Sequence, residues 1–342
     1  MKKLLNTLYV LTPESYLFCR NENICIKLGG EEKLAVPALT IDTIVCFGQM
    51  TVSTPLLAFC GEHGISITFL TQNGAFQGRF YGPVSGNVLL RKKQYESLND
   101  PVFCCRYVRD ELYAKLRNSK MVLLRHARNA ETGNDGAPLY EAAQKLSEAA
   151  EALSRCDTID SMRGAEGAAA TVYFAQFDEM LRGNPNGFRF ETRSRRPPRN
   201  EVNAALSFTY MLLTREVQSA LETVGLDPAA GYLHTLRPGR ASFALDLVEE
   251  LRAPLCDRFV LSLFNRGQLA AGDFDTGEEA VYLSEGGRKT VLTAWQRRKT
   301  EEITHPFLNE KVQIGMIPFL QAMLFARVLR GDLDRYPPFI WR

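Results

Sequence analysis

This sequence has no sign of a disulfide framework, a membrane span or a strong electrostatic field. Its eight cysteines form no CxxC pair and several lie at apolar positions, which argues against a structural zinc site and favours reduced, buried thiols in a cytoplasmic protein. No apolar run approaches the length of a membrane-spanning helix, and the first residues carry no small-residue cleavage site, so we expect neither membrane association nor a signal peptide. Because the formal net charge is only +2, any affinity for nucleic acid must come from local basic patches.

The common signatures of nucleotide-binding and serine-hydrolase sites are also missing. The sequence contains neither a glycine-rich phosphate loop nor a GxSxG elbow, and it has no internal repeat. What it does contain is an ordinary globular composition, with 45% hydrophobic and 23% charged residues. A length of 342 residues suits two domains or one large one.

The spacing of apolar residues changes along the chain. Over roughly the first eighty residues, short β-rich segments alternate with turn residues, and one helix is expected over 54–63. From residue 87 onward the period becomes helical. We therefore predict an α+β fold, with a small β-sandwich-like N-terminal domain over 1–88 and a larger all-α domain over 89–342. The main helices expected in the second domain are 88–97, 102–129, 139–154, 161–181, 201–223, 258–270 and 307–329.

A stretch from Gly231 to Arg252 combines a histidine with a pair of acids three residues apart. His234 lies in an apolar run, a Pro/Gly turn follows, and Ser242 can cap a helix that carries Asp246 and Glu249. Three residues apart on a helix, the two carboxylates share one side, and the turn can bring the imidazole back to them. Such groups can ligate Mg²⁺, Mn²⁺ or Zn²⁺. The alternative is a solvated acidic face beside a packed histidine.

A further acid, Glu166, lies on the apolar stripe of its own expected helix, together with Tyr173 and Phe177. A carboxylate buried among apolar groups is unfavourable unless it is paired or coordinates a metal. Glu166 is therefore a candidate metal ligand, and a glutamate that reaches solvent or pairs with an arginine is the alternative.

A basic loop lies between these two candidate halves of a site. Prolines and glycines keep it from forming a regular helix, and its arginine forks can bind phosphate oxygens. The alternative is a solvated basic loop. The candidate DNA-binding residues, which include two from the turn after His234, are Arg189, Arg193, Arg195, Arg196, Arg199, Arg237 and Arg240.

Four blocks of the sequence together resemble a known family. They are RGAEGAAATVYF, FETRSRRPPRNEVNAALSFTYMLL, GLDPAAGYLHTLRPGRASFALDLVEELRAP and the run from Arg297 to Tyr336. In this order they are similar to the CRISPR-associated integrase family, the larger metal-dependent subunit of the spacer-acquisition complex. The ending YPPFIWR and the overall length look most like the type I-C branch.

This resemblance implies a function and a site. The helical domain would be the catalytic one, with Glu166, His234 and Glu249 as ligands of Mg²⁺ or Mn²⁺ and Asp246 as a further acid beside the metal. The enzyme would join 3′-hydroxyl ends of short double-stranded DNA fragments to the repeat array by transesterification. The resemblance also implies a homodimer that uses its β-rich domain for dimer or partner contacts and binds a small ferredoxin-like subunit.

Two other functions remain open from the residues themselves. A metal-dependent nuclease without an integrase role would keep the same site and work without a partner. A non-catalytic nucleic-acid-binding scaffold would pair Glu166 and Glu249 with arginines. Because Asp246 and Glu249 share a helix face, spacing alone does not say which acid ligates the metal, and the resemblance assigns that role to Glu249.

Overall fold

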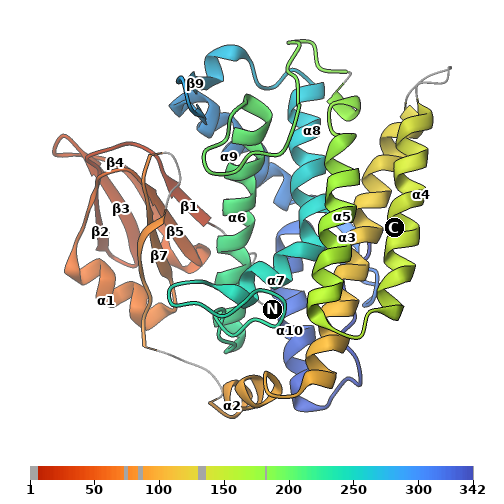
Figure 1. The fold of residues 1–342 in the computed structure, drawn as a ribbon. Coiled ribbons are helices and arrows are strands. Elements are labelled where there is room, and N and C mark those ends of the chain that lie inside the picture. The colour runs from red at the N-terminus through yellow and green to blue at the C-terminus, as the bar shows by residue number, and fades with distance from the viewer. Residues whose placement is uncertain (1–6, 73–75, 84–87, 130–135, 182, 342) are drawn as a thin grey trace. The chain divides into compact units, whose positions relative to one another are not determined.

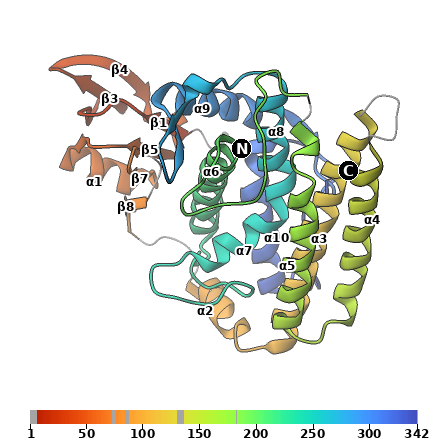
Figure 2. The ribbon, with the colours of Figure 1, turned by 45° about the horizontal axis from the view of Figure 1, so that its top comes forward.

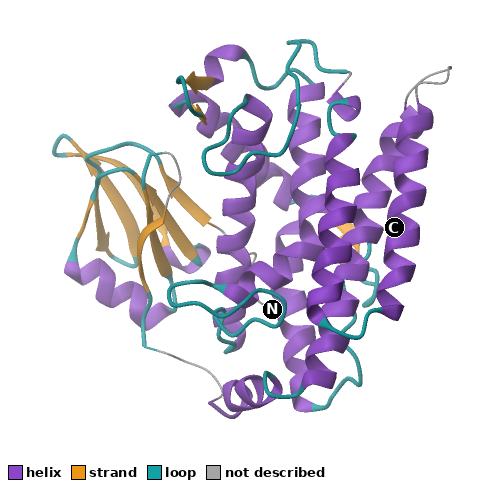
Figure 3. Ribbon diagram, in the orientation of Figure 1, coloured by secondary structure: helices purple, strands orange, loops and turns teal. Residues whose placement is uncertain are grey.

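The computed structural model describes residues 7–72, 76–83, 88–129, 136–181 and 183–341 (Figure 1). The chain forms two compact units. One comprises residues 1–86 and 292–300, and the other comprises residues 87–291 and 301–342. The first contains most of the strands, and the second is mainly helical, as Figure 3 shows. The predicted order, a β-rich N-terminal region followed by a helical domain in an α+β fold, is confirmed.

The first unit contains two four-stranded sheets. One has the order β1 (Thr7–Val10), β5 (Thr43–Phe47), β7 (Ser66–Leu70) and β8 (Phe76–Phe80). Its first three strands run parallel and β8 is antiparallel to β7. The other has the order β4 (Glu31–Pro37), β3 (Asn23–Leu28), β2 (Tyr16–Arg20) and β6 (Thr51–Val52). Only its β2–β6 pair is parallel.

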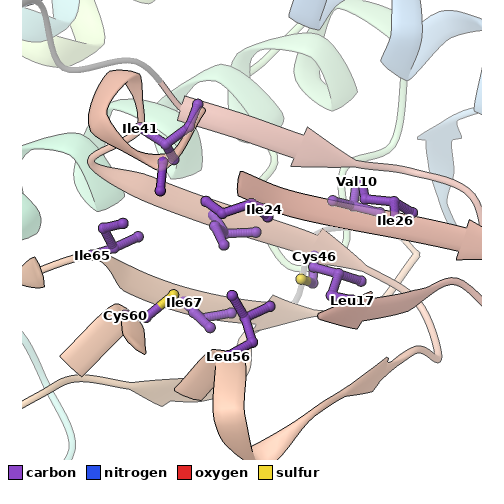
Figure 4. Packing of buried hydrophobic residues seen from close by; sticks show 12 residues of the cluster. Val10, Leu17, Ile24, Ile26, Ile41, Cys46, Leu56, Cys60, Ile65 and Ile67 are labelled. Carbon is purple, nitrogen blue, oxygen red and sulfur yellow. The ribbon is translucent and has the colours of Figure 1, made fainter. Parts of the chain in front are cut away.

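Residues from both sheets and from α1 (Thr54–His63) form the core of the first unit (Figure 4). Ile24 and Ile67 come from different sheets, and both are fully buried together with Leu56 of α1. The bounds of α1 follow from local chemistry, because the Ser53 hydroxyl accepts a bond from the Leu56 N–H and Gly64 ends the helix at φ +68°.

The second unit is built on long helices that lie side by side in Figures 1 and 2. Helices α3, α4 and α5 pack on one another, and α3 also packs on α7. Its helices are α2 (Val88–Ser97), α3 (Pro101–Asn129), α4 (Ala137–Ala152), α5 (Ile159–Ala175), α6 (Glu201–Val224), α7 (Ser242–Leu251), α8 (Arg258–Asn265) and α10 (Ile317–Arg330). Helix α9 (Glu285–Lys299) begins in this unit and ends in the other.

Two short hairpins interrupt the helices of the second unit, so this unit is mainly helical and not all-α as predicted. They are β9 (Phe274–Thr276) with β10 (Val281–Leu283), and β11 (Glu302–Thr304) with β12 (Lys311–Gln313). The prediction of a helix over 307–329 is wrong at its start. The second hairpin includes residues 311–313, and the helix begins only at Ile317. The helix expected over 161–181 ends at Ala175, before a 3₁₀ turn over Glu179–Leu181. No described helix is long and apolar enough to cross a bilayer.

Aromatic side chains fill the core of the second unit around α3, α7 and α10. Tyr107 packs on Tyr232, Phe243, Phe325 and Tyr336 with ring centroids 5.0–6.1 Å apart. Tyr232 belongs to the loop before α7 and Tyr336 to the C-terminal tail. This cluster therefore fixes the loop and the tail against the helices that carry the candidate site.

Candidate active site

Helix α7 carries two of the predicted site acids and is buried on almost all sides. Asp246 has no exposed surface and Glu249 only 4%, so the solvated acidic face considered above is wrong. The expected cap is wrong as well, because Ser242 is the first helical residue and its hydroxyl donates to the Thr235 carbonyl at 3.1 Å. The apolar residues Phe243 and Leu247 of the same helix are fully buried.

Asp246 holds the histidine loop to the helix. Its Oδ2 accepts the backbone N–H groups of Tyr232 and Leu233 at 2.6 and 3.0 Å, and its Oδ1 accepts that of His234 at 2.9 Å. The loop packs so closely that a Cβ on Gly231 would lie 2.6 Å from the carbonyl carbon of Ser242. Both oxygens of Asp246 are thus occupied inside the protein.

Asp246 also orients the imidazole of His234. The Nδ1 of His234 lies 2.7 Å from Asp246 Oδ1, so Nδ1 donates its proton to the carboxylate. That bond leaves the lone pair on Nε2, which lies 3.8 Å from Glu249 Oε1. The predicted pairing of this histidine with α7 is therefore present in the fold, with one nitrogen held and the other presented to Glu249.

Lys115 of α3 joins Glu166 of α5 to Glu249 of α7. Its ammonium forms an ion pair with Glu166 Oε1 and lies 2.7 Å from Glu249 Oε2. The three side chains expose only 16%, 24% and 5% of their surface, respectively. Both acids therefore contact one ammonium nitrogen, and His234 borders Glu249 through the other carboxylate oxygen, Oε1.

A second cation, Arg252, follows α7. Its Nη1 lies 2.9 Å from Glu249 Oε1, and its guanidinium lies 5.1 Å from the centroid of the Tyr210 ring. Arg252 opens a π-helical segment, Arg252–Asp257, whose Pro254 has no N–H for a regular helical bond. This irregular turn places a guanidinium beside the carboxylate at the end of α7.

These neighbours set the charge of the site. Burial alone raises the pKa of Glu249, but Arg252, Lys115 and His234 lower it to about 2, so the carboxylate is ionised at neutral pH. Burial lowers the pKa of Lys115, yet Glu249 and Glu166 raise it above its ordinary value. A further buried acid of α3, Glu111, has its pKa raised well above the usual range by burial and then by Asp246 and Glu249.

The described residues contain no preformed cluster of three histidine, cysteine or acidic side chains with metal-site geometry. The donor set nevertheless fits a divalent cation, because two carboxylates and one imidazole nitrogen are the ligand types that Mg²⁺ and Mn²⁺ accept. In this structure the Lys115 ammonium is the cation between the carboxylates of Glu166 and Glu249.

The predicted arginines differ in what they contact. Arg189 pairs with Asp178 at 2.6 Å. Arg193 is half-buried and donates to Asn203 Oδ1 at 2.7 Å. Of the remaining candidates, Arg195, Arg196, Arg199 and Arg237 are exposed, and Arg240 is half-buried.

A small cavity of about 40 Å³ connects the acids to the basic loop. Glu166 and Glu249 line it together with Lys115, Arg193 and Arg252. This volume admits only a few water molecules, so a larger substrate would have to lie at its mouth. Anionic and cationic groups thus line one space.

Lys115 and Arg252 were not identified as site residues from the sequence. One signal was available, because Glu111, Lys115 and Asn118 follow at helical spacing on α3 and all are largely buried. A polar stripe inside a buried helix indicates partners elsewhere in the fold.

Comparisons with known proteins agree with this architecture. A family model described as CRISPR associated protein Cas1 matches residues 8–297. CRISPR-associated endonuclease Cas1 1 of Chlorobaculum tepidum is 46% identical over 343 residues, covering 100% of both chains. CRISPR-associated endonuclease Cas1 3 of Thermus thermophilus is 36% identical, covering 98% of this chain and 97% of its own.

Solved structures share the fold at lower identity. A CAS1 protein from Thermotoga maritima aligns with a TM-score of 0.81 and 23% identity, covering 96% of this chain and 97% of its own. A casposase bound to integration product aligns with a TM-score of 0.83 and 21% identity, covering 98% and 94%. A chain in a Cas6-RT-Cas1–Cas2 complex aligns over 99% of this chain with a TM-score of 0.82 and 19% identity.

Proposed function

Since this chain belongs to the Cas1 family of CRISPR-associated endonucleases, we propose that Glu166, His234 and Glu249 hold the divalent ion of its active site. The enzyme is an endonuclease and integrase of CRISPR adaptation, and its family is metal-dependent. The observation that carries the proposal is that Glu249 links the other two side chains, since it shares the Lys115 ammonium with Glu166 and borders His234 Nε2. The proposal also includes membership of the type I-C branch and Mg²⁺ or Mn²⁺ as the bound ion.

The reaction we propose is the joining of a 3′-hydroxyl end to a phosphodiester of the repeat array. A divalent ion would neutralise the non-bridging oxygens and lower the pKa of the attacking hydroxyl. Asp246 keeps His234 in the tautomer that presents Nε2, and its hydrogen bonds leave no carboxylate oxygen without a partner. We therefore assign direct ligation to Glu249 and orientation of His234 to Asp246.

The arginine loop is proposed to bind DNA phosphates. Arg195 lines the cavity that Glu166 and Glu249 share, and the neighbouring Arg196 and Arg199 are exposed. Guanidinium groups bind phosphate oxygens in bidentate fashion, and they would fix double-stranded DNA across the acids. Arg237 and Arg240 would add contacts from the histidine loop, whereas Arg189 and Arg193 are held by protein partners in this structure.

The β-rich unit is proposed to form a homodimer and to contact a small ferredoxin-like partner subunit. Its edge strand β4 carries Leu34 with 41% of its surface exposed, and the following turn carries Leu39 with 82% exposed. An edge strand with exposed apolar residues is suited to pairing with a second chain.

A strand-transfer assay with Mn²⁺, with and without the small partner subunit, tests the function. We expect metal-dependent cleavage of branched DNA, joining that requires the partner, and loss of both in Glu166→Gln. Glu141→Gln is the control, because Glu141 is an exposed glutamate that pairs with Lys145. Cleavage without joining would favour a stand-alone nuclease, and binding without metal-dependent cleavage would favour a scaffold.

A further inference from the structure

Glu111 is a buried acid for which the proposed reaction has no use. Its residue has no exposed surface, and neither of its side-chain oxygens has a hydrogen-bond partner among the described residues. Burying a carboxyl group without a partner is unfavourable by several kcal/mol in order of magnitude. A buried acid without a partner in one state of a protein therefore suggests a partner that arrives in another state.

Lys115 is the cation placed to reach it. The two residues are four apart on α3, so their side chains leave the helix on the same face, one turn from each other. A lysine side chain has a flexible stem of four methylene groups and three N–H donors, so its ammonium can change partners without movement of the backbone. In this structure it is committed to Glu166 and Glu249.

Lys115 and a divalent ion would compete for those carboxylates. Ligand oxygens lie about 2.0–2.6 Å from Mg²⁺, Mn²⁺ or Ca²⁺, and the ammonium already lies 2.7 Å from Glu249 Oε2. Two cations competing for the same oxygens also repel each other strongly in a buried site. A displaced ammonium would still be buried and would need another acceptor.

We propose that Lys115 is a positioning residue that exchanges between two acceptors, Glu166 with Glu249 in the metal-free enzyme and Glu111 when the divalent ion is bound. This inference rests on the metal site proposed above. Lys115 then keeps the ligand carboxylates together before the ion binds, and Glu111 stabilises the lysine afterwards. When the divalent ion binds, it takes the place of the Lys115 ammonium between the two carboxylates.

A double-mutant cycle on Mn²⁺ affinity, measured by calorimetry on the full chain, tests the exchange. Lys115→Met removes the competitor and should tighten Mn²⁺ binding by about tenfold or more. Glu111→Gln removes the second acceptor and should weaken binding by a similar factor. In the double variant the affinity should equal that of Lys115→Met, because Glu111 acts only through Lys115.

Lys120→Met is the matched control, since this lysine of the same helix contacts Ser147 Oγ at 3.0 Å and should not alter affinity. Equal weakening by Glu111→Gln with and without Lys115 would overturn the exchange, because it would show a general charge effect. Weaker Mn²⁺ binding in both Lys115→Met and Lys115→Gln would also overturn it, and the second variant covers a folding defect in the first. Absence of Mn²⁺ binding in the wild-type chain would instead contradict the proposed metal site itself.

Discussion

Three acids of α7 that are close in sequence have three different sets of partners. Asp246 accepts backbone N–H groups and the imidazole of His234, while Glu249 faces Lys115 and Arg252. Glu250 accepts the Tyr336 hydroxyl at 2.7 Å, the Phe339 N–H at 2.8 Å and the Gln321 amide at 2.9 Å. Burial raises the pKa of Glu250 to about 7 even though these hydrogen bonds favour its charged form. Neighbouring carboxyl groups therefore differ in charge because their partners differ.

The division of labour between Asp246 and Glu249 predicts different losses of metal. Glu249→Ala should abolish cleavage and strand transfer and weaken Mn²⁺ binding strongly. Asp246→Asn should keep Mn²⁺ affinity within about tenfold to a hundredfold while slowing the reaction. It should also lower the free energy of unfolding by about 1–3 kcal/mol, because an amide NH₂ would face N–H donors. Calorimetry and urea unfolding measure both effects, and loss of the metal only in Asp246→Asn would reverse the assignment.

His305 predicts a pH dependence of stability away from the site. Its Nδ1 accepts the N–H groups of Phe307 and Leu308 at 3.3 Å, and Nε2 donates to Gln321 Oε1 at 3.1 Å. Burial lowers the pKa of His305 below its ordinary value of 6.5, although the bond to Gln321 raises it. The unfolded chain therefore binds this proton first, and stability falls as the pH drops below 6.5.

Urea unfolding at pH 7.5 and 5.5 checks this expectation. His305→Gln should lose less stability between the two pH values than the wild type, because its side chain does not titrate there. An equal loss in both proteins would show that His305 contributes nothing to the pH dependence.

At the scale of elements, the basic loop is anchored on α6 by one buried side chain. Asn203 donates to the Thr192 carbonyl at 2.8 Å, and its Oδ1 accepts the Ser194 N–H at 3.1 Å. Arg195 and Arg196 follow directly and are exposed. Asn203 thus anchors the backbone of the loop, and the two arginines that follow are exposed to solvent. This arrangement is expected for side chains that bind phosphate.

The double variant Arg195→Ala/Arg196→Ala should bind DNA more weakly and with a shallower salt dependence. Each phosphate contact that is lost should reduce the slope of log affinity against log salt by about 0.9. Lys92→Ala/Lys145→Ala is the control, because both lysines are exposed and each pairs with a glutamate of its own helix, away from the basic loop. Fluorescence anisotropy at several salt concentrations gives the slope, and an unchanged slope would mean that these arginines do not touch phosphate.

At the scale of the whole molecule, all the candidate ligands belong to one compact unit. Glu166, His234 and Glu249 lie within residues 87–291, while the exposed Leu34 and Leu39 lie in the β-rich unit. Assembly and metal binding should therefore be separable by mutation.

We expect Leu34→Glu/Leu39→Glu to shift the protein from dimer to monomer without changing Mn²⁺ affinity. Light scattering gives the mass, and calorimetry gives the affinity. Val102→Glu is the control, since Val102 is 75% exposed on the other unit. A double variant that remains dimeric would place the dimer contact elsewhere, and a monomeric wild type would contradict the homodimer.

The sequence by itself was sufficient for properties that depend on neighbouring residues. The helix over 54–63 follows from Ser53 and Gly64, and the helical bounds of α3 and α6 follow from apolar spacing, because both depend on groups within a few turns. The order of the four sequence blocks also identified the family. The apolar spacing predicted a helix from residue 307, and this was wrong for the residues before Ile317. There, cross-strand pairing of residues 302–304 with 311–313 outweighs the apolar spacing.

Only the tertiary structure decided how the site is charged. Lys115 lies 51 residues before Glu166 in the chain, and no local pattern connects them. The packing of α3 against α5 and α7 brings the ammonium between the two carboxylates. The same packing buries Glu111 without a partner and encloses Asp246. Burial and long-range ion pairs depend on which helices meet, and that is determined by the packing of the whole unit around its aromatic core.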